Sequence, residues 1–369
     1  MRCILNICEI DITNFRNYSH ANFRPASFNI FYGNNAQGKS NFIEAIYYLG
    51  NGISYRTNQS RELINWDSDY FRLEAHCTND QGTITIKSLL NPNEKNIYID
   101  GVKINRLSEL FKNISVCIFE PDDLALVKGN PSKRRSFLDR EIVTIQPLYY
   151  DLIKRFNNVN HQRNSLLKFA RRDKNLISQL EDWTDLYTKF AYKIVVKRID
   201  FLKKIKPYLE YYLKKITQNK ENLDIIYEIG QIGEKIVDYN AYCEKIKSFK
   251  SEEIEKGNSL FGPHRDDFNV YINGYNVKKY GSQGQQRTVA LCLKLAYLEI
   301  AKQELGEYPI LLLDDVMSEL DMERRIVLVD TIHDKIQTFL TTTDLDMIKV
   351  LVKKSTILQI HDGKIINTS

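Results

Sequence analysis

Eight residues near the N-terminus have the types and spacing of a loop that binds phosphate. Residues 33–40 match the P-loop pattern G-x-x-x-x-G-K-S. Glycines in such a loop let backbone N–H groups turn toward phosphate oxygens, and its lysine reaches the β- and γ-phosphates. Its serine hydroxyl can bind Mg²⁺, so ATP and Mg²⁺ are the expected ligands. The candidate nucleotide-binding residues are Gly33, Asn34, Asn35, Ala36, Gln37, Gly38, Lys39 and Ser40.

The flanking sequence places this loop between a strand and a helix. Residues 28–32 form a short apolar run, and Phe42, Ile43, Ile46 and Leu49 recur at helical spacing. A helix N-terminus directly after the loop adds a partial positive charge where the phosphates would lie. The alternative, a glycine turn that matches the pattern by chance, is the weaker interpretation because the flanks fit as well as the motif.

A second apolar run ends in two carboxylates. Residues 310–315 read Ile-Leu-Leu-Leu-Asp-Asp, which predicts a buried strand followed by acids at its end. A P-loop protein needs a carboxylate to hold the Mg²⁺ that bridges the phosphates, and Asp314 is the candidate. Asp315 is the candidate catalytic base that orients or deprotonates water, acting with Lys39. The alternative is a buried strand that an aspartate caps in a turn.

Residues 281–287 place a serine and two glycines at the start of a predicted helix. Ser282, Gly284 and Gln285 could offer a hydroxyl and backbone N–H groups to an anion. By themselves they fit an ordinary helix N-cap equally well. Beside the other two motifs they resemble the signature motif of ABC ATPases, in which each nucleotide lies between the P-loop of one head and the signature of another. Residues 318–321 likewise resemble the D-loop of that class.

The spacing of the motifs narrows the resemblance to one family. Lys39 and Asp314 are 275 residues apart, more than in a transporter subunit, and the insert at 121–255 is far shorter than the coiled coil of an SMC-type head. The chain resembles the RecF family of bacterial DNA replication and repair proteins. The residues that carry this resemblance are Asn14-Phe15-Arg16-Asn17-Tyr18, Ser54-Tyr55-Arg56-Thr57, Lys133-Arg134-Arg135-Ser136-Phe137-Leu138-Asp139, Gly262-Pro263-His264-Arg265-Asp266-Asp267 and Ser282-Gln283-Gly284-Gln285-Gln286-Arg287.

The resemblance implies a cytoplasmic ATPase that forms a head-to-head homodimer on ATP and binds single-stranded, double-stranded or gapped DNA. It also implies work with RecR and RecO in loading recombinase at gaps or junctions. Two alternatives stay open, a transporter ATPase subunit and a nucleotide-gated DNA scaffold that does not hydrolyse ATP. The glutamine and histidine that sense the γ-phosphate in ABC ATPases are missing. Glu120-Pro121-Asp122 follows the strand expected at 114–119, and Thr341-Thr342-Thr343-Asp344 stands where the histidine should follow the strand expected at 337–342.

The element pattern predicts an α/β fold, an ABC-type head with an inserted, mainly helical lobe. We expect the head to comprise residues 1–120 and 256–369 and the basic lobe residues 121–255. Pro207 should end or kink the last long helix of the lobe. The expected strands lie at 4–12, 28–32, 71–77, 83–90, 95–105, 114–119, 223–227, 268–271, 276–279, 309–314, 337–342 and 356–360, and the remaining expected helices at 40–49, 238–249, 285–304 and 323–333.

Positive charge is concentrated in the insert. Residues 128–220 contain 22 Lys and Arg and 9 Asp and Glu, a balance of +13 in a chain of net charge +5. An anionic partner is therefore expected, nucleic acid before membrane. The candidate DNA-binding residues are Lys133, Arg134, Arg135, Arg171 and Arg172. Lys133, Arg134 and Arg135 would lie in the first turn of a helix, where the positive end of the helix dipole repels cations. Either an external anion or a nearby aspartate would offset this repulsion. Arg16 is a candidate nucleotide contact or a solvated surface residue.

Other classes of protein are disfavoured by what the sequence lacks. No segment approaches the roughly 18 apolar residues of a membrane span. Six cysteines occur without C-x-x-C spacing, which argues against a zinc site and suits a reducing cytoplasm.

Overall fold

The computed structural model describes residues 5–79, 82–170, 173, 176–230, 238–352 and 354–367. The chain divides into two compact units, residues 1–124 with 291–369, and residues 125–290. The boundary falls inside helix α10 (Gln283–Leu305), which therefore contributes to both. Residues 256–290 group with the second unit because strand β10 (Asp267–Ile272) pairs with β9 (Leu223–Glu228). The predicted lobe limits, 121–255, stay a prediction.

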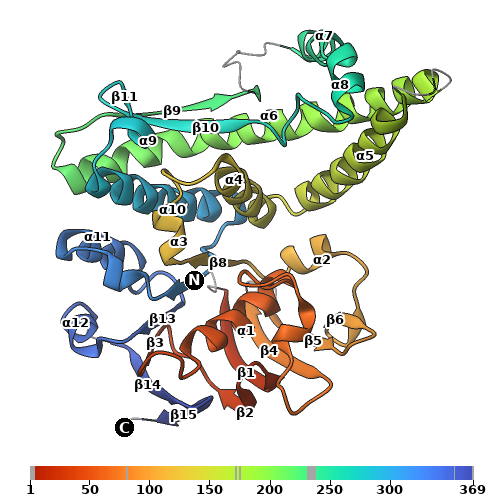
Figure 1. Ribbon diagram of the computed structural model, residues 1–369. Helices are drawn as coiled ribbons and strands as arrows, with labels where there is room; N and C mark the ends of the chain where they lie inside the picture. The colour runs from red at the N-terminus through yellow and green to blue at the C-terminus, as the bar shows by residue number, and fades with distance from the viewer. Residues whose placement is uncertain are drawn as a thin grey trace. The chain divides into compact units, whose positions relative to one another are not determined.

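Two six-stranded sheets form the first unit (Figure 1). One is antiparallel, in the order β2 (Tyr18–Phe23), β1 (Asn6–Phe15), β4 (Phe71–Asn79), β5 (Gly82–Leu90), β6 (Lys95–Ile99) and β7 (Val102–Lys103). The other runs β15 (Lys364–Asn367), β14 (Thr356–His361), β3 (Phe28–Tyr32), β13 (Thr338–Thr342), β12 (Ile310–Asp314) and β8 (Val116–Phe119). All neighbours in this second sheet are parallel except β14 and β15.

Helix α1 (Lys39–Asn51) packs against strands of both sheets. Its apolar side chains are buried almost all round, as expected for a helix enclosed by two apolar surfaces. The described part of this unit also contains the short helices α2 (Leu107–Phe111), α3 (Pro121–Leu124), α11 (Met322–Ile332) and α12 (Leu345–Lys349), together with residues 291–305 of α10. Because parallel strands end at the same edge of their sheet, β3, β12 and β13 bring their carboxyl-terminal residues together.

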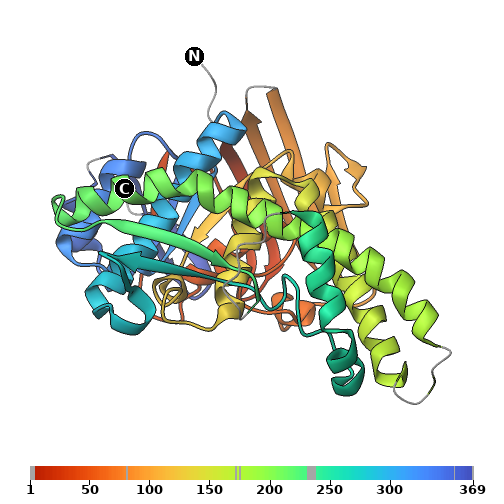
Figure 2. The same cartoon turned by 90° about the horizontal axis from the view of Figure 1, so that it is seen from above.

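The second unit is mainly helical. It contains α4 (Pro131–Ile145), α5 (Leu148–Ala170), α6 (Leu176–Thr217), α7 (Tyr239–Ser248), α8 (Lys250–Lys256), α9 (Val277–Tyr280) and the sheet β11 (Tyr275–Asn276), β10, β9. Figures 1 and 2 show β9 and β10 running alongside α6. Helix α6 continues through Pro207, so the expectation that this proline might end the helix is wrong. Within the described residues, none of the helices is both long and apolar enough to span a bilayer.

Two local expectations also differ from the structure. The segment between residues 15 and 28 holds the additional strand β2, which a tight turn joins to β1, with Asn14 and Arg16 at φ 55° and 53°. Residues 277–280 form α9 and not a strand, because the Asn276 side chain accepts hydrogen bonds from the backbone N–H groups of Lys278 and Lys279.

Candidate nucleotide-binding site

The P-loop joins β3 to α1, as its motif predicts. Gly33 and Gly38 have φ of 152° and 110°, values that L side chains rarely adopt. A Cβ at Gly33 would overlap the backbone oxygen of Ile360, and one at Gly38 would lie 2.7 Å from the Asn17 side chain. Gly33 is therefore required by conformation and by space, and Gly38 by its conformation.

Lys39 turns its ammonium group back over the loop. Its Nζ donates hydrogen bonds of 2.7 Å to the carbonyl oxygens of Gly33 and Asn34. Burial lowers the pKa of Lys39, while the charges of Asp315 and Asp314 oppose that shift. The loop thus holds the Lys39 cation over its own carbonyl groups, and contact with a phosphate stays a prediction.

Asp314 is the point at which distant parts of the chain meet. The hydroxyl groups of Ser40 and Thr341 each donate a hydrogen bond of 2.8 Å to its Oδ1. The Tyr55 hydroxyl donates one of 2.8 Å to its Oδ2. Ser40 and Asp314 are 274 residues apart in sequence, and the order β3, β13, β12 brings them together.

The pair formed by Ser40 and Asp314 fits a magnesium ion. Hydroxyl and carboxylate oxygens are the ligands that Mg²⁺ takes, and in nucleotide sites it is held by one or two carboxylates together with phosphate oxygens. No group of three or more His, Cys, Asp and Glu side chains suited to a metal occurs in the described parts of the chain. A metal at Ser40 and Asp314 would therefore depend on the phosphates of a nucleotide.

Asp315 follows the strand in a strained conformation. Its φ is 53°, and its backbone N–H donates a hydrogen bond of 2.9 Å to the Thr341 hydroxyl. Its Oδ1 is buried without a hydrogen-bond partner among the described residues. Burial raises the pKa of Asp315, the nearby Asp314 raises it further, and Lys39 opposes both effects. A more basic carboxylate that retains a vacant acceptor suits the proton acceptor predicted here.

Comparison with known proteins identifies the family. The sequence matches the family described as RecF/RecN/SMC N terminal domain over residues 6–366. The DNA replication and repair protein RecF of Geobacillus kaustophilus is 37% identical over 366 residues, 97% of this chain and 98% of the relative. That of Bacillus subtilis is 38% identical over 352 residues, 92% and 94% of the two chains.

The chain belongs to the RecF family.

Solved structures agree with this assignment. The structure described as the recombination mediator protein RecF-ATPrS in the RecFOR pathway superposes with a TM-score of 0.92 at 33% identity, over 100% of this chain and 99% of that chain. An Smc head domain from Pyrococcus furiosus superposes with a TM-score of 0.57 at 15% identity, over 99% and 97% of the two chains, a likeness of fold alone. The predicted α/β fold, an ABC-type head with an inserted, mainly helical lobe, is confirmed, and the transporter alternative finds no support among these relatives.

Two RecF-like motifs meet on a buried carboxylate that the sequence analysis missed. Arg16 forms a two-pronged ion pair with Glu44, with N–O distances of 2.9 and 2.8 Å, and Arg56 approaches the same carboxylate at 3.2 Å. Glu44 is fully buried in α1. Arg16 is thus held within the protein, and a contact with nucleotide stays a prediction. A carboxylate inside the apolar run 42–46 was the available signal for this cluster.

Tyr55 and Thr341 were also missed as partners of Asp314. Thr341 is the last residue but one of β13, the strand after which ABC ATPases carry their histidine, and its hydroxyl donates a hydrogen bond to Asp314. The glutamine that senses the γ-phosphate in ABC ATPases would follow β8, and in this chain the buried Lys294 of α10 contacts β8 and the segment after it. Its Nζ lies 2.7 Å from the carbonyl oxygen of Ile118 and 3.1 Å from Asp123.

The predicted signature residues lie in the second unit and form a helix cap. The Ser282 hydroxyl accepts a hydrogen bond from the Gln285 N–H at 3.2 Å, and the Gln285 Oε1 accepts one from the Ser282 N–H at 2.9 Å. This reciprocal pair is a capping box at the start of α10. Gly284 lies in the first turn, where its carbonyl accepts a bond from Thr288. The capping alternative is therefore present, and binding of a second molecule's nucleotide stays a prediction.

Arg134 is not the DNA contact that the sequence suggested. It is 2% exposed, forms a two-pronged ion pair with Asp267 at 2.7 and 2.8 Å, and donates to three backbone carbonyls. No external phosphate can reach a guanidinium enclosed in this way. Lys133 is exposed and Arg135 is half-buried, whereas Arg171 and Arg172 lie outside the described residues.

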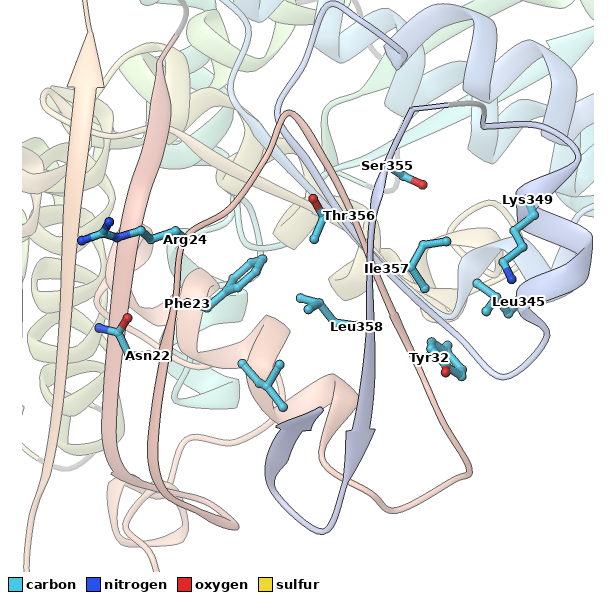
Figure 3. A pocket seen from close by; sticks show the side chains of 11 residues that line it. Asn22, Phe23, Arg24, Tyr32, Leu345, Lys349, Ser355, Thr356, Ile357 and Leu358 are labelled. Carbon is cyan, nitrogen blue, oxygen red and sulfur yellow. The ribbon is translucent and has the colours of Figure 1, made fainter. Parts of the chain in front are cut away.

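A hollow of about 850 Å³ lies elsewhere in the first unit (Figure 3). Figure 3 shows Phe23 of β2, Thr356 and Leu358 of β14, and Lys349 of α12 among its lining residues. Neither the P-loop residues nor the two carboxylates line it. The hollow and the candidate nucleotide site are therefore separate places.

Proposed function

We propose that this chain is an ATP-dependent DNA-binding protein of recombinational repair and replication restart. The observation that carries the proposal is the hydrogen bond between Ser40 and Asp314, which joins the P-loop to the acid that a magnesium nucleotide requires. Membership of the RecF family supports the cellular role, because the relatives are named DNA replication and repair proteins.

In this proposal residues 33–40 bind the phosphates of ATP, and Ser40 and Asp314 hold Mg²⁺ against them. Two molecules associate head to head, so that Ser282, Gly284 and Gln285 of one contact the nucleotide of the other. Asp315 accepts a proton from water, and Lys39 stabilises the charge that develops on the phosphate. The raised pKa of Asp315 supports its role. In this proposal hydrolysis is slow and is stimulated by DNA.

DNA contacts come from the basic insert, with Lys133 and Arg135 as the described candidates. Single-stranded, double-stranded and gapped DNA are all possible ligands. RecR and RecO are the proposed partners in loading recombinase at gaps or junctions, since a solved relative is described as a recombination mediator in the RecFOR pathway.

The decisive experiment measures the mass of the protein by light scattering with and without ATP and Mg²⁺, and again with DNA. We expect a dimer only with ATP and Mg²⁺. The matched control is Lys39→Met, which should stay monomeric under every condition. A parent that remains monomeric with ATP, or a variant that dimerises like the parent, would contradict the proposal. Phosphate release from the dimer separates an ATPase from the scaffold alternative.

A further inference from the structure

A cavity of about 250 Å³ lies in the second unit where three helices meet. Helix α4 contributes residues at positions i, i+3, i+4 and i+7, which share one helical face. Helices α5 and α6 and the loop at 263–264 complete the lining, which consists of Ser132, Arg135, Ser136, Asp139, Ile153, Phe156, Asn157, Ile194, Arg198, Pro263 and His264. Two RecF-like motifs, residues 133–139 and 262–267, thus meet around this cavity.

The carboxylate of the cavity is already neutralised. Asp139 forms a two-pronged ion pair with Arg198 at 2.9 and 2.8 Å and accepts a hydrogen bond of 2.7 Å from the Tyr149 hydroxyl. Arg198 in turn donates to the carbonyl oxygen of Pro263 at 2.7 Å. This pair therefore adds no net charge to the lining.

Arg135 is the charge that remains. It has no ion pair within the described residues, and its only hydrogen bond runs to the carbonyl oxygen of Asp266 at 2.9 Å. Burial lowers the pKa of Arg135, and the neighbouring Arg198 lowers it further. His264 is neutral near pH 7, because burial lowers its pKa to about 4. The lining residues carry one more positive than negative charge, and the nearby carboxylates of Asp267 and Asp266, which do not line the cavity, offset part of it. An anion in the cavity would stabilise the remaining positive charge.

We propose that this cavity binds a single phosphate group. Arg135 supplies the charge and a planar set of donors suited to phosphate oxygens, and the exposed hydroxyls of Ser132 and Ser136 lie on the same face of α4. Phe156 and Ile194 form apolar walls, which strengthen the attraction by lowering the local dielectric. The volume is below the range of pockets for drug-sized ligands, so it suits one phosphate and not a whole nucleotide.

The phosphate could belong to a DNA backbone or be free in solution, and the experiment separates these sources. Only the DNA source rests on the proposed function. Three variants each lower the charge by one unit. Arg135→Gln removes the cavity's cation, Ser136→Asp places a carboxylate beside it, and the matched control Lys133→Gln changes an exposed residue of the same helix that does not line the cavity.

The first measurement uses inorganic phosphate in a Lys39→Met background, which disables the P-loop as a phosphate site. We expect phosphate to raise the melting temperature more than chloride at equal ionic strength. Arg135→Gln and Ser136→Asp should abolish this difference, and Lys133→Gln should retain it. Two cavity variants guard against a folding defect in one of them. No difference between phosphate and chloride in the Lys39→Met protein would overturn a site for free phosphate.

The second measurement is the affinity of the full chain for a short DNA duplex with ATP. If the phosphate is that of DNA, Arg135→Gln and Ser136→Asp lose about tenfold or more in affinity, beyond the loss of Lys133→Gln. Inorganic phosphate then also competes with DNA in the parent. If all three variants lose the same DNA affinity, and inorganic phosphate raises the melting temperature in the first measurement, the site is one for free phosphate. Equal losses of DNA affinity without stabilisation by inorganic phosphate overturn the proposal. A parent protein that fails to bind DNA refutes the proposed function alone.

Discussion

Asp314 accepts hydrogen bonds from three hydroxyl groups. Ser40, Thr341 and Tyr55 each donate to one of its oxygens, so the carboxylate has a single orientation. Ser40 would itself bind the metal, whereas Tyr55 and Thr341 only position the acid. Groups that orient a metal ligand commonly change metal affinity when they are removed.

Tyr55→Phe should therefore raise the Mg²⁺ concentration that ATP binding requires by about tenfold or more. The ring keeps its packing against Tyr47, and only the hydrogen bond to Asp314 is lost. Calorimetric titration of ATP at several Mg²⁺ concentrations measures the effect. Tyr70→Phe, at a half-exposed tyrosine of the same unit, is the control. An unchanged Mg²⁺ requirement would mean that Tyr55 has no role in positioning Asp314.

His264 should make stability depend on pH. Burial lowers its folded pKa to about 4 from 6.5, so the unfolded chain binds more protons between these values and stability rises with pH across the window. The full contribution is about 3 kcal/mol at most. His264→Gln should remove this rise, which denaturant unfolding near pH 4.5 and near pH 7 would measure.

Asp266 acts in the opposite direction. Burial raises its pKa to about 6 from 3.8, so its contribution falls as pH rises through that range. Asp266 is present in both proteins, and the comparison therefore isolates His264. If parent and His264→Gln gained the same stability between the two pH values, the imidazole would not be buried in its neutral form.

Helix α10 carries two polar features. Its first turn contains the Ser282 capping box, and the buried Lys294 near its middle donates a hydrogen bond to the carbonyl oxygen of Ile118 in β8, an edge strand of the candidate site's sheet. Ser282 thus has two candidate roles, as a helix cap and as a ligand of the second molecule's phosphate. A substitution that keeps one role and removes the other can separate them.

Ser282→Asp provides this separation. Aspartate is as good an N-cap as serine, so the free energy of unfolding should stay within about 0.5 kcal/mol of that of the parent. Its negative charge repels phosphate, so ATP-dependent dimers should be lost while monomers still bind ATP. Light scattering and calorimetry measure the two effects. Ser282→Ala is the reverse control, since it costs about 1 kcal/mol of helix stability without adding a charge. Dimers that persist in Ser282→Asp would leave capping as the only role.

Arg134 joins α4 to β10 through Asp267. Arg134→Met should destabilise the protein by about 3–5 kcal/mol, because it leaves a largely buried carboxylate without its partner. Chemical denaturation measures the loss. Lys133→Met, one residue earlier and exposed, should cost less than about 0.5 kcal/mol. Similar stabilities of the two variants would contradict the structural role of Arg134.

For the whole molecule, charge and association act together. Residues 128–220 carry a balance of +13, so DNA binding should be electrostatic and largely independent of sequence. Two molecules joined by ATP would roughly double the phosphate contacts on one DNA. The slope of log affinity against log salt should therefore become steeper with ATP, by about 0.9 for each added contact. Salt titrations with and without ATP test this, and Lys39→Met should show the shallow slope in both.

The amino-acid sequence is enough to predict the fold class, the family and two parts of the phosphate site, the P-loop and Asp314. Gly33, Gly38, Lys39 and Ser40 stand within one short motif, and local chemistry dictates both their conformation and their ligand. The apolar run that ends in Asp314 is equally local, because burial of a parallel strand imposes its composition. Patterns of this kind depend on neighbours in the chain, and such neighbours are visible without the tertiary structure.

The contacts between polar groups, by contrast, are visible only in the folded chain. Glu44 joins Arg16 to Arg56, Tyr55 and Thr341 converge on Asp314, and Arg134 turns inward to Asp267. The order of the strands and the packing of the helices bring these residues together, and such contacts produce no periodic pattern in the sequence. A run of cations reads the same whether each faces solvent or a buried carboxylate. Packing separated Lys133, Arg134 and Arg135, because successive residues of a helix point about 100° apart, so adjacent charges cannot share one environment.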